Sequence, residues 1–269
     1  MKSARHGARG VRDIAALAVR HVLAAWSGAS GRSARALGRQ RGAVPVLMYH
    51  RILSDGADAS GIEPGMFVRA SAFGHQVEWL VSRWSVRTLR QALDSPPSHD
   101  DEPFAVITFD DGWRDNLTVA WPILERHGAR ATIFLVRDWV RDGRGEDGEF
   151  LRPRDVSMLA AQGMDFGAHT VTHPRLDGLD AAAIESEMRA SKDAVEAWTG
   201  RECETFAYPF GVSSPRAEDA ARRLFRCAVI TRGGWWRPGH DPARLPRVAM
   251  HHDMTSTRWM FESRLAAGD

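Results

Sequence analysis

Short apolar runs alternate with longer amphipathic segments along most of the chain. The apolar runs predict strands over residues 44–48, 104–109, 131–136, 164–168, 205–208 and 227–231. Helices are expected over residues 73–80, 116–127 and 180–198, and from Ser214 and Pro215 onward. Strands that alternate with helices are typical of βαβ units. The pattern therefore predicts one α/β domain with a parallel sheet or barrel.

The first 42 residues differ from the rest of the chain in charge. They hold nine Lys or Arg residues and one acid, Asp13, which gives a side-chain charge of +8. The other 227 residues carry 27 basic and 33 acidic side chains, or −6. A mildly acidic body with one basic arm argues against a nucleic-acid-binding face. We predict a basic, partly helical or disordered arm over residues 1–42 and the α/β domain over residues 43–269.

The apolar stretch of this arm, residues 14–26, is short and is interrupted by Arg20 and His21. A membrane span takes about 20 residues, and the continuous apolar core and cleavage site of a secretory signal are missing. As a helix, the stretch could lie on an anionic membrane, so a peripheral membrane contact and a plain leader both stay open. The location is left open between cytoplasmic, membrane-peripheral and exported.

The composition is that of an ordinary globular protein, with 43% apolar and 26% charged residues. Its two cysteines, Cys203 and Cys227, exclude a disulfide scaffold and a four-cysteine zinc site. They could pair with each other if the protein is exported, and the sequence does not decide this.

Two adjacent carboxylates end the predicted strand over residues 104–109. They are Asp110 and Asp111, and Gly112 permits a turn that brings both to one site. Catalytic groups of α/β proteins collect at this end of a strand. Two acids in one pocket can divide their roles, one binding a metal and the other accepting a proton. A plain turn is the alternative.

Two histidines, His169 and His173, follow the predicted strand over residues 164–168. Their spacing of four predicts two imidazoles on one face of a helical turn, although an isolated pair is also compatible with a surface loop. Together with Asp111 they form a donor set suited to Zn²⁺ or a similar cation. Asp110 would then lie beside the cation as a base.

Two further segments follow predicted strands. Tyr208 and Phe210 flank Pro209 and suggest a rigid wall for a sugar ring, with a packed turn as the alternative. Trp113 is another candidate for stacking on a sugar, although tryptophans in a barrel are as often part of the core. His50 follows the first predicted strand, where a structural histidine is the simpler interpretation.

In this order and at these separations, the segments resemble the polysaccharide deacetylases of carbohydrate esterase family 4, the NodB-homology domain. The resemblance rests on T-F-D-D-G at residues 108–112, H-T-x-T-H at 169–173 and A-Y-P-F-G at 207–211. The early segment V-L-M-Y-H-R-I at residues 46–52 is similar to the branch of biofilm poly-N-acetylglucosamine deacetylases. The resemblance spans about residues 44–252.

This resemblance implies a distorted (β/α) barrel and metal-dependent amide hydrolysis. It implies one divalent ion, Zn²⁺ first and Co²⁺ or Ni²⁺ as alternatives, held by Asp111, His169 and His173. Asp110 becomes the base and His50, titrating near neutrality, the general acid. The ion and a backbone N–H, such as that of Tyr208, would hold the oxyanion.

Two features depart from the family pattern. The arginine that normally orients the base is replaced by Ala207, and we expect Arg247 to take its place. The late leucine-x-histidine motif is not clean, although His251 and His252 lie in that region and are alternatives to His50 as the acid.

The expected activity is removal of N-acetyl groups from amino sugars of a polysaccharide or other glycan. The alternatives are deacylation of a lipid-linked sugar at the membrane, which the basic arm would favour, and a glycan-binding relative without catalysis. The identity of the glycan and the oligomeric state are left open.

Overall fold

The computed structural model describes residues 32–268, except residues 39, 41, 99–101, 143–147 and 232–233. The apolar stretch expected over residues 14–26 lies outside the described residues. Among the helices that are described, none has the length and apolar character needed to cross a membrane.

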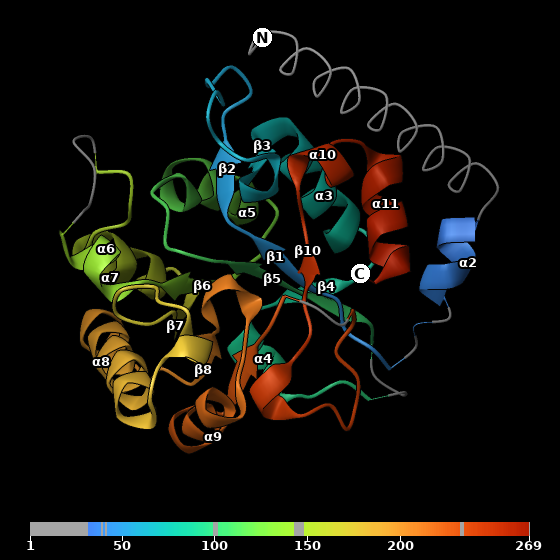
Figure 1. Ribbon diagram of the computed structural model, residues 1–269. Helices are drawn as coiled ribbons and strands as arrows, with labels where there is room; N and C mark the ends of the chain where they lie inside the picture. The colour runs from blue at the N-terminus through green and yellow to red at the C-terminus, as the bar shows by residue number, and fades with distance from the viewer. Residues whose placement is uncertain are drawn as a thin grey trace, which may run out of the picture.

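The strands of the main sheet are β1 (Val46–Tyr49), β4 (Ser85–Arg87), β5 (Phe104–Phe109), β6 (Thr132–Leu135), β7 (Asp165–Ala168), β8 (Thr205–Ala207), β9 (Cys227–Val229) and β10 (Val248–Ala249). They form one parallel sheet in the order β10-β1-β5-β6-β7-β8-β9, with β4 paired to the start of β5 (Figure 1). The short strands β2 (Arg51–Leu53) and β3 (Phe67–Arg69) pair separately. All six strands predicted from the sequence are present, within two residues at each end.

One segment, residues 245–249, joins the two ends of this sheet. Leu245 forms a parallel bridge with Val229 of β9, and Val248 pairs with Leu47 of β1. The sheet therefore curls into a distorted (β/α) barrel, which confirms the predicted fold class. Because every pairing is parallel, the carboxyl ends of the strands meet at one edge.

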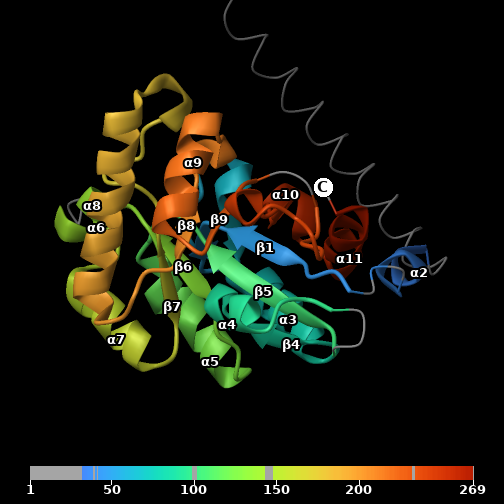
Figure 2. The ribbon, with the colours of Figure 1, turned by 90° about the horizontal axis from the view of Figure 1, so that it is seen from below.

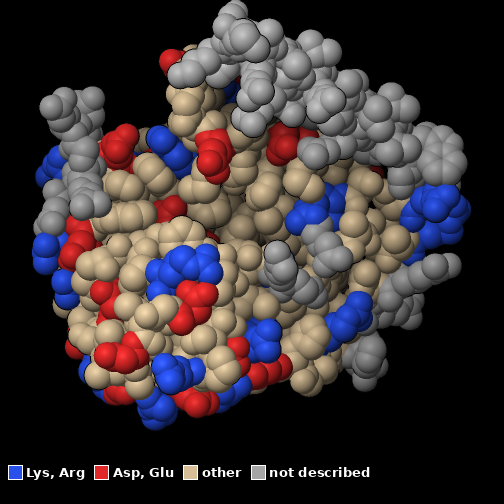
Figure 3. Space-filling model, in the orientation of Figure 1, with Lys and Arg blue, Asp and Glu red and all other residues tan. Residues whose placement is uncertain are grey.

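Helices cover the outside of the curled sheet (Figures 1 and 2). They are α2 (Arg32–Gly38), α3 (Ala70–Val81), α4 (Leu89–Asp94), α5 (Trp121–Arg126), α6 (Arg137–Asp142), α7 (Pro153–Ala161), α8 (Ala181–Thr199), α9 (Pro215–Leu224), α10 (His252–Thr255) and α11 (Arg258–Ala267). Helix α2, the described part of the arm, lies against α11 in both views. Over α8 and α9, acidic and basic side chains intermingle (Figure 3), and Arg223 of α9 pairs with Glu185 of α8 at 2.9 Å.

Local sequence signals fix the ends of the clearest helices. The Asp180 side chain accepts a hydrogen bond from the Ala183 N–H at the start of α8, and Gly200 ends that helix with a φ of 67°. Ser214 caps α9 in the same way through the Ala217 N–H. Short polar side chains and a glycine therefore set these boundaries, as the sequence predicts.

The helix expected over residues 116–127 begins differently. Residues Asn116–Ala120 form a π-helical turn, and α5 starts at Trp121. Pro122 has no N–H and cannot donate to the carbonyl one turn earlier, so the regular hydrogen-bond ladder is interrupted here. The wide turn leaves the Asn116 side chain free to donate to the His50 carbonyl oxygen at 2.9 Å.

The strand that carries the two carboxylates is held on both faces. All six residues of β5 are buried. The rings of Tyr49, Phe73 and Phe109 meet with centroids 5.2–5.8 Å apart, and the Tyr49 hydroxyl donates to the Gln76 side chain at 2.8 Å. Close packing of this kind leaves the edge beyond Phe109 little freedom to move.

Candidate metal and active site

The carboxyl edge of the sheet brings together residues that are far apart in the sequence. Tyr49 pairs with Phe109, and the Asp110 N–H donates to the Tyr49 carbonyl oxygen at 2.9 Å, so His50 and Asp110 lie at the same level of adjacent strands. His169 follows Ala168, the last residue of β7. The parallel register thus collects the predicted chemistry at one edge.

Three of these side chains form a cluster with the geometry of a metal site. Asp111 Oδ1 lies 3.5 Å from His169 Nε2 and 3.6 Å from His173 Nε2. Donors bound to one zinc ion at 2.0–2.1 Å with tetrahedral angles lie about 3.3 Å apart. One carboxylate oxygen and two imidazole nitrogens at this spacing therefore fit a single divalent ion.

The two histidines do not lie on a helical turn, and this prediction is wrong. Thr170 and His173 have φ angles of 69° and 61°, so the segment is a tight loop with left-handed residues. Glu187 of α8 holds this loop, because its carboxylate accepts from the N–H groups of Val171 at 2.7 Å and Thr172 at 3.0 Å. The loop brings His173 back toward His169, as a helical turn would have done.

His169 is oriented by the backbone of the neighbouring strand. Its Nδ1 lies 2.7 Å from the Ala207 carbonyl oxygen and donates to it, which leaves the Nε2 lone pair directed at the cluster. Burial lowers the pKa of His169 to about 3, and burial also lowers the pKa of His173. Both imidazoles are therefore neutral at pH 7, the form that binds metals.

Asp111 is oriented by Trp113, a residue expected to stack on sugar. The Trp113 indole N–H donates to Asp111 Oδ2 at 3.0 Å, which leaves Oδ1 to face the histidines. Its ring contacts Phe150 at 4.4 Å and the Arg51 guanidinium at 4.4 Å. Trp113 therefore supports the metal site and is not a free platform for a sugar ring.

Asp110 is paired with a buried arginine. Arg247 is 1% exposed, and its two terminal nitrogens donate to the two oxygens of Asp110, each at 2.7 Å. Arg247 also donates to Thr108 Oγ1 and to the Ile230 carbonyl oxygen, both at 3.2 Å. The residue expected to compensate for Ala207 thus makes the bidentate contact that such a role requires.

The two neighbouring aspartates differ in charge state. Burial would raise the pKa of Asp110, but the charge and hydrogen bonds of Arg247 outweigh it and lower this pKa to about 2. Burial and the charge of Asp110 raise the pKa of Asp111 to about 7. The site without an ion therefore holds one firmly ionised carboxylate beside one that readily binds a proton.

His50 lies at the same edge, but the expected titration near neutrality is wrong. Desolvation lowers the pKa of His50 to about 4, although the charge of Asp110 acts in the opposite direction. His251 is level with His50 on the next strand, because the Met250 N–H donates to the Met48 carbonyl oxygen. His252 lies farther along and stacks on Phe67 at 5.0 Å.

The segment expected to form a sugar wall is mostly core. Tyr208 is fully buried. Its N–H donates to the Val229 carbonyl oxygen at 3.2 Å, and its hydroxyl donates to the Ala243 carbonyl oxygen at 3.0 Å. This N–H pairs β8 with β9, so it is not available to an oxyanion. Pro209 is buried, whereas Phe210 is 56% exposed and its ring centroid lies 4.7 Å from that of His173.

Comparisons with known proteins agree with this geometry. The sequence pattern of the family described as polysaccharide deacetylase matches residues 98–225. YxkH of Bacillus subtilis is 28% identical over 198 residues, covering 71% of this chain and 65% of that protein. Residues 98–225 therefore form a domain of the polysaccharide deacetylase family.

Other relatives of the family share the fold or part of the sequence. A chitooligosaccharide deacetylase of Rhizobium leguminosarum is 28% identical over 146 residues, 52% of this chain and 63% of that protein. The chain thus spans slightly less than two thirds of each of these curated relatives. The deacetylase PplD of Streptococcus pyogenes has the same fold, with a TM-score of 0.72, 23% identity and coverage of 84% of this chain and 97% of that chain.

Both cysteines, Cys203 and Cys227, are buried and unpaired. Burial raises the pKa of Cys203 to about 12, so its thiol is protonated at neutral pH. The sequence did not decide whether Cys203 and Cys227 pair, and in this structure they do not form a disulfide.

Replacing either His169 or His173 with Ala should abolish zinc binding and leave the fold intact. Each residue supplies one of three donors, whereas a domain of this size is stable through its hydrophobic core. Zinc content after dialysis, measured by elemental analysis, and circular dichroism test this. Full zinc occupancy in both variants would contradict the assigned site.

Zinc affinity should depend on a single proton between pH 7 and pH 5. His169 is already neutral in this range because burial lowers its pKa to about 3, and burial also lowers the pKa of His173, so below about pH 7 the ion competes chiefly with the proton of Asp111. The dissociation constant should therefore rise about tenfold for each pH unit lost below 7. Titrations with a zinc indicator at several pH values measure the slope, and release of two or three protons per ion would be inconsistent with this charge assignment.

Arg247→Met should destabilise the fold by about 3–5 kcal/mol, because it leaves a buried carboxylate without its partner. Adding Asp110→Asn should restore part of the loss. Urea unfolding at pH 7 measures both variants, with Arg189→Met as a control that breaks an exposed pair on α8. Since the folded pKa of Asp110 lies below its unfolded value of about 3.9, the stabilisation is present above about pH 4 and is lost as the pH falls toward 2. Equal stability of Arg247→Met and the wild type would contradict the role of the pair.

Proposed function

We propose that this protein hydrolyses the N-acetyl amide of amino sugars in a glycan, using one divalent ion, Zn²⁺ first, held by Asp111, His169 and His173. The observation that carries the proposal is the position of Asp110. It is a carboxylate adjacent to the three donors and is held ionised by a buried arginine. A protein that only bound a glycan would have no use for a base kept charged at this depth.

Amide hydrolysis needs a water made more acidic and a proton acceptor beside it. The ion, when bound, polarises the amide carbonyl and acidifies a water molecule. Asp110 is ionised at pH 7 in the absence of substrate, because its pKa lies far below neutrality, and it is therefore available to accept the water proton. Arg247 fixes both oxygens of Asp110, so the base cannot rotate away from the reacting centre.

The leaving amine also has to gain a proton. His50 is next to Asp110 in the register of β1 and β5 and lies at the open edge of the barrel. With a pKa of about 4, the ring is neutral at pH 7, so it can donate only a proton released by the reaction itself. We assign to His50 the transfer of the proton that Asp110 has accepted from water to the nitrogen of the leaving amine.

The substrate approaches from the side of Phe210. Its exposed ring lies beside His173, and the Arg175 guanidinium lies 5.9 Å from its centroid. An aromatic face flanked by a cation suits a sugar ring with polar substituents. Among the four residues expected to contact sugar, Phe210 is therefore the one that we retain.

A lipid-linked amino sugar is a second candidate substrate. The basic arm favours it, because residues 1–42 carry +8 while the rest of the chain carries −6. Basic segments near anionic lipid contribute on the order of 1 kcal/mol per residue. Hydrolysis that requires anionic vesicles, with little turnover of soluble oligosaccharides, would select this substrate.

Asp110→Asn should abolish amine release from acetylated chitooligosaccharides while zinc is retained, because the base is lost and the ligands are not. His50→Ala should lower the rate by about 10²–10⁴, the usual contribution of a positioned general acid or base. His251→Ala and His252→Ala serve as controls and should each change it less than tenfold. If His50→Ala keeps its rate while His251→Ala loses it, the proton comes from the late segment instead.

A further inference from the structure

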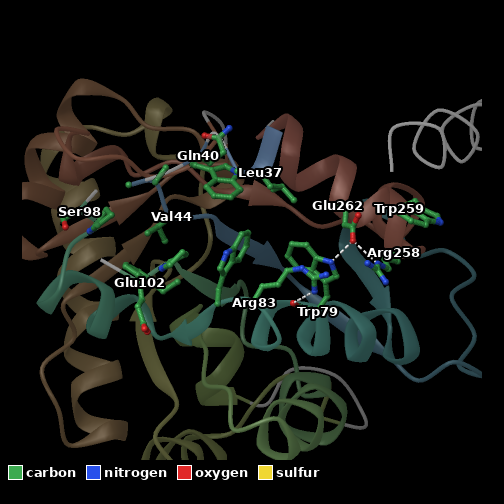
Figure 4. A pocket seen from close by; sticks show the side chains of 18 residues that line it. Leu37, Gln40, Val44, Trp79, Arg83, Ser98, Glu102, Arg258, Trp259 and Glu262 are labelled. Carbon is green, nitrogen blue, oxygen red and sulfur yellow. Dashed lines mark hydrogen bonds and ion pairs between the residues drawn. The ribbon is translucent and has the colours of Figure 1, made fainter. Parts of the chain in front are cut away.

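A cavity lies at the end of the barrel opposite the metal and active site. It has a volume of about 880 Å³ and is lined by α2, α3, α11 and the amino ends of β1 and β5 (Figure 4). Phe104 lines it, whereas Asp110 follows the opposite end of the same strand and lies about 20 Å from Phe104 at the rise of a β-strand. The cavity is therefore separate from the metal and active site, and its volume is in the range of ligand-binding cavities.

Three tryptophans form one wall of this cavity. Trp84 packs edge-on against Trp79 and Trp235, with centroids 5.3 and 5.6 Å apart. The indole N–H groups of the outer two are engaged, Trp79 with Glu262 Oε1 at 2.6 Å and Trp235 with the Leu265 carbonyl oxygen at 2.9 Å. The wall is thus rigid before any ligand binds. The partly exposed ring of Trp84 can stack against the apolar face of a ligand.

A largely buried carboxylate that lines the same cavity uses only one of its two oxygens in hydrogen bonds to described residues. Glu262 is 7% exposed, and its Oε1 accepts from Trp79 and from Arg258 Nε at 2.9 Å. Its Oε2 has no hydrogen-bond partner among the residues that the structure describes. A carboxylate oxygen of a largely buried residue that lines the cavity can accept a hydrogen bond from a ligand that donates one.

The charges of the cavity select among ligands. Glu262 and Glu102 both line it, so an acyl chain would leave these carboxylates without a hydrogen-bond donor, and a phosphate group would be repelled by them. The guanidinium groups of Arg83 and Arg258 line it as well. Sugar hydroxyls both donate to carboxylates and accept from guanidinium groups, and the faces of the sugar ring stack on indoles.

We propose that this cavity is a second glycan-binding site, which holds a sugar chain apart from the metal and active site. That the chain is an N-acetylated glycan rests on the proposed function; that the ligand is a saccharide rests on the cavity itself. A chain bound at two places is retained more strongly than one bound at the active site alone. The cavity would thereby favour polymers over short oligosaccharides.

The test measures binding of N-acetylated chitohexaose by calorimetry to the full chain carrying Asp110→Asn, which removes the base. We expect two binding sites. Adding Glu262→Gln, which keeps the shape and the bond to Trp79, or Trp84→Ala should weaken one of them at least tenfold and leave the other unchanged. Glu185→Gln, which alters an exposed i,i+4 Arg–Glu pair on α8, is the control and should leave both sites unchanged.

Thermal unfolding shows whether each variant is folded, and Glu262→Gln remains informative if Trp84→Ala is not. Unchanged binding by a folded Glu262→Gln variant would overturn the proposal. A single binding site in the Asp110→Asn protein would also overturn it. If the added substitutions weaken binding to phosphatidylglycerol vesicles but not to the hexasaccharide, the cavity is a lipid site and the proposal is wrong. Amine release by the wild-type protein is measured separately. If no amine is released but both binding sites are present, the proposed function is refuted and the second glycan-binding site is not.

Discussion

The structure depends on the buried ion pair between Arg247 and Asp110. Its partners are separated by 137 residues, yet both ends of the contact are bidentate at 2.7 Å. Removing a guanidinium and a carboxylate from water is costly, and only close geometry with further hydrogen bonds offsets that penalty. Thr108 and the Ile230 carbonyl oxygen supply those bonds to Arg247. The same segment, residues 245–249, also joins β9 to β1, so the segment that closes the barrel also holds the proposed base.

This pair gives two adjacent aspartates opposite properties. Arg247 keeps Asp110 ionised, and the resulting negative charge together with burial makes ionisation of Asp111 unfavourable until a cation is present. A divalent ion would therefore bind on the side of Asp111, where two neutral imidazoles would complete the donor set. Asp110, the proposed base, and Asp111, the proposed metal ligand, are neighbours in the chain, and the guanidinium of Arg247, which contacts Asp110 only, distinguishes them.

The sequence was sufficient to predict what depends on strand register. The strand over residues 104–109, the carboxylates that follow it and the two histidines were all predicted, because parallel strands bring their carboxyl ends together. Arg247 was predicted by the absence of an arginine at Ala207. Contacts that depend on loop geometry could not be predicted from the sequence. The left-handed φ angles of Thr170 and His173 replace the expected helical turn, and neither residue is glycine.

Other misses have the same origin in tertiary contacts. Trp113 could not be placed on Asp111 from composition, since an indole near a motif is equally a sugar platform. Glu187, which holds the histidine loop from α8, carries no signal beyond being an acid on a helix face. The N–H of Tyr208 is occupied because β9 pairs at that point, and the low pKa of His50 follows from desolvation that only packing reveals.

The central claim is that Arg247 keeps Asp110 ionised so that it can act as the base. Carbon-13 NMR of the aspartate side-chain carboxyl groups, with the Asp110 signal assigned through Asp110→Asn, tests it directly. In the wild-type protein the Asp110 signal should not titrate between pH 8 and pH 4, whereas in Arg247→Met, where burial is no longer outweighed by the guanidinium, it should titrate within that range. The same flat signal in both proteins would show that Arg247 does not set the charge of Asp110, and would contradict the account.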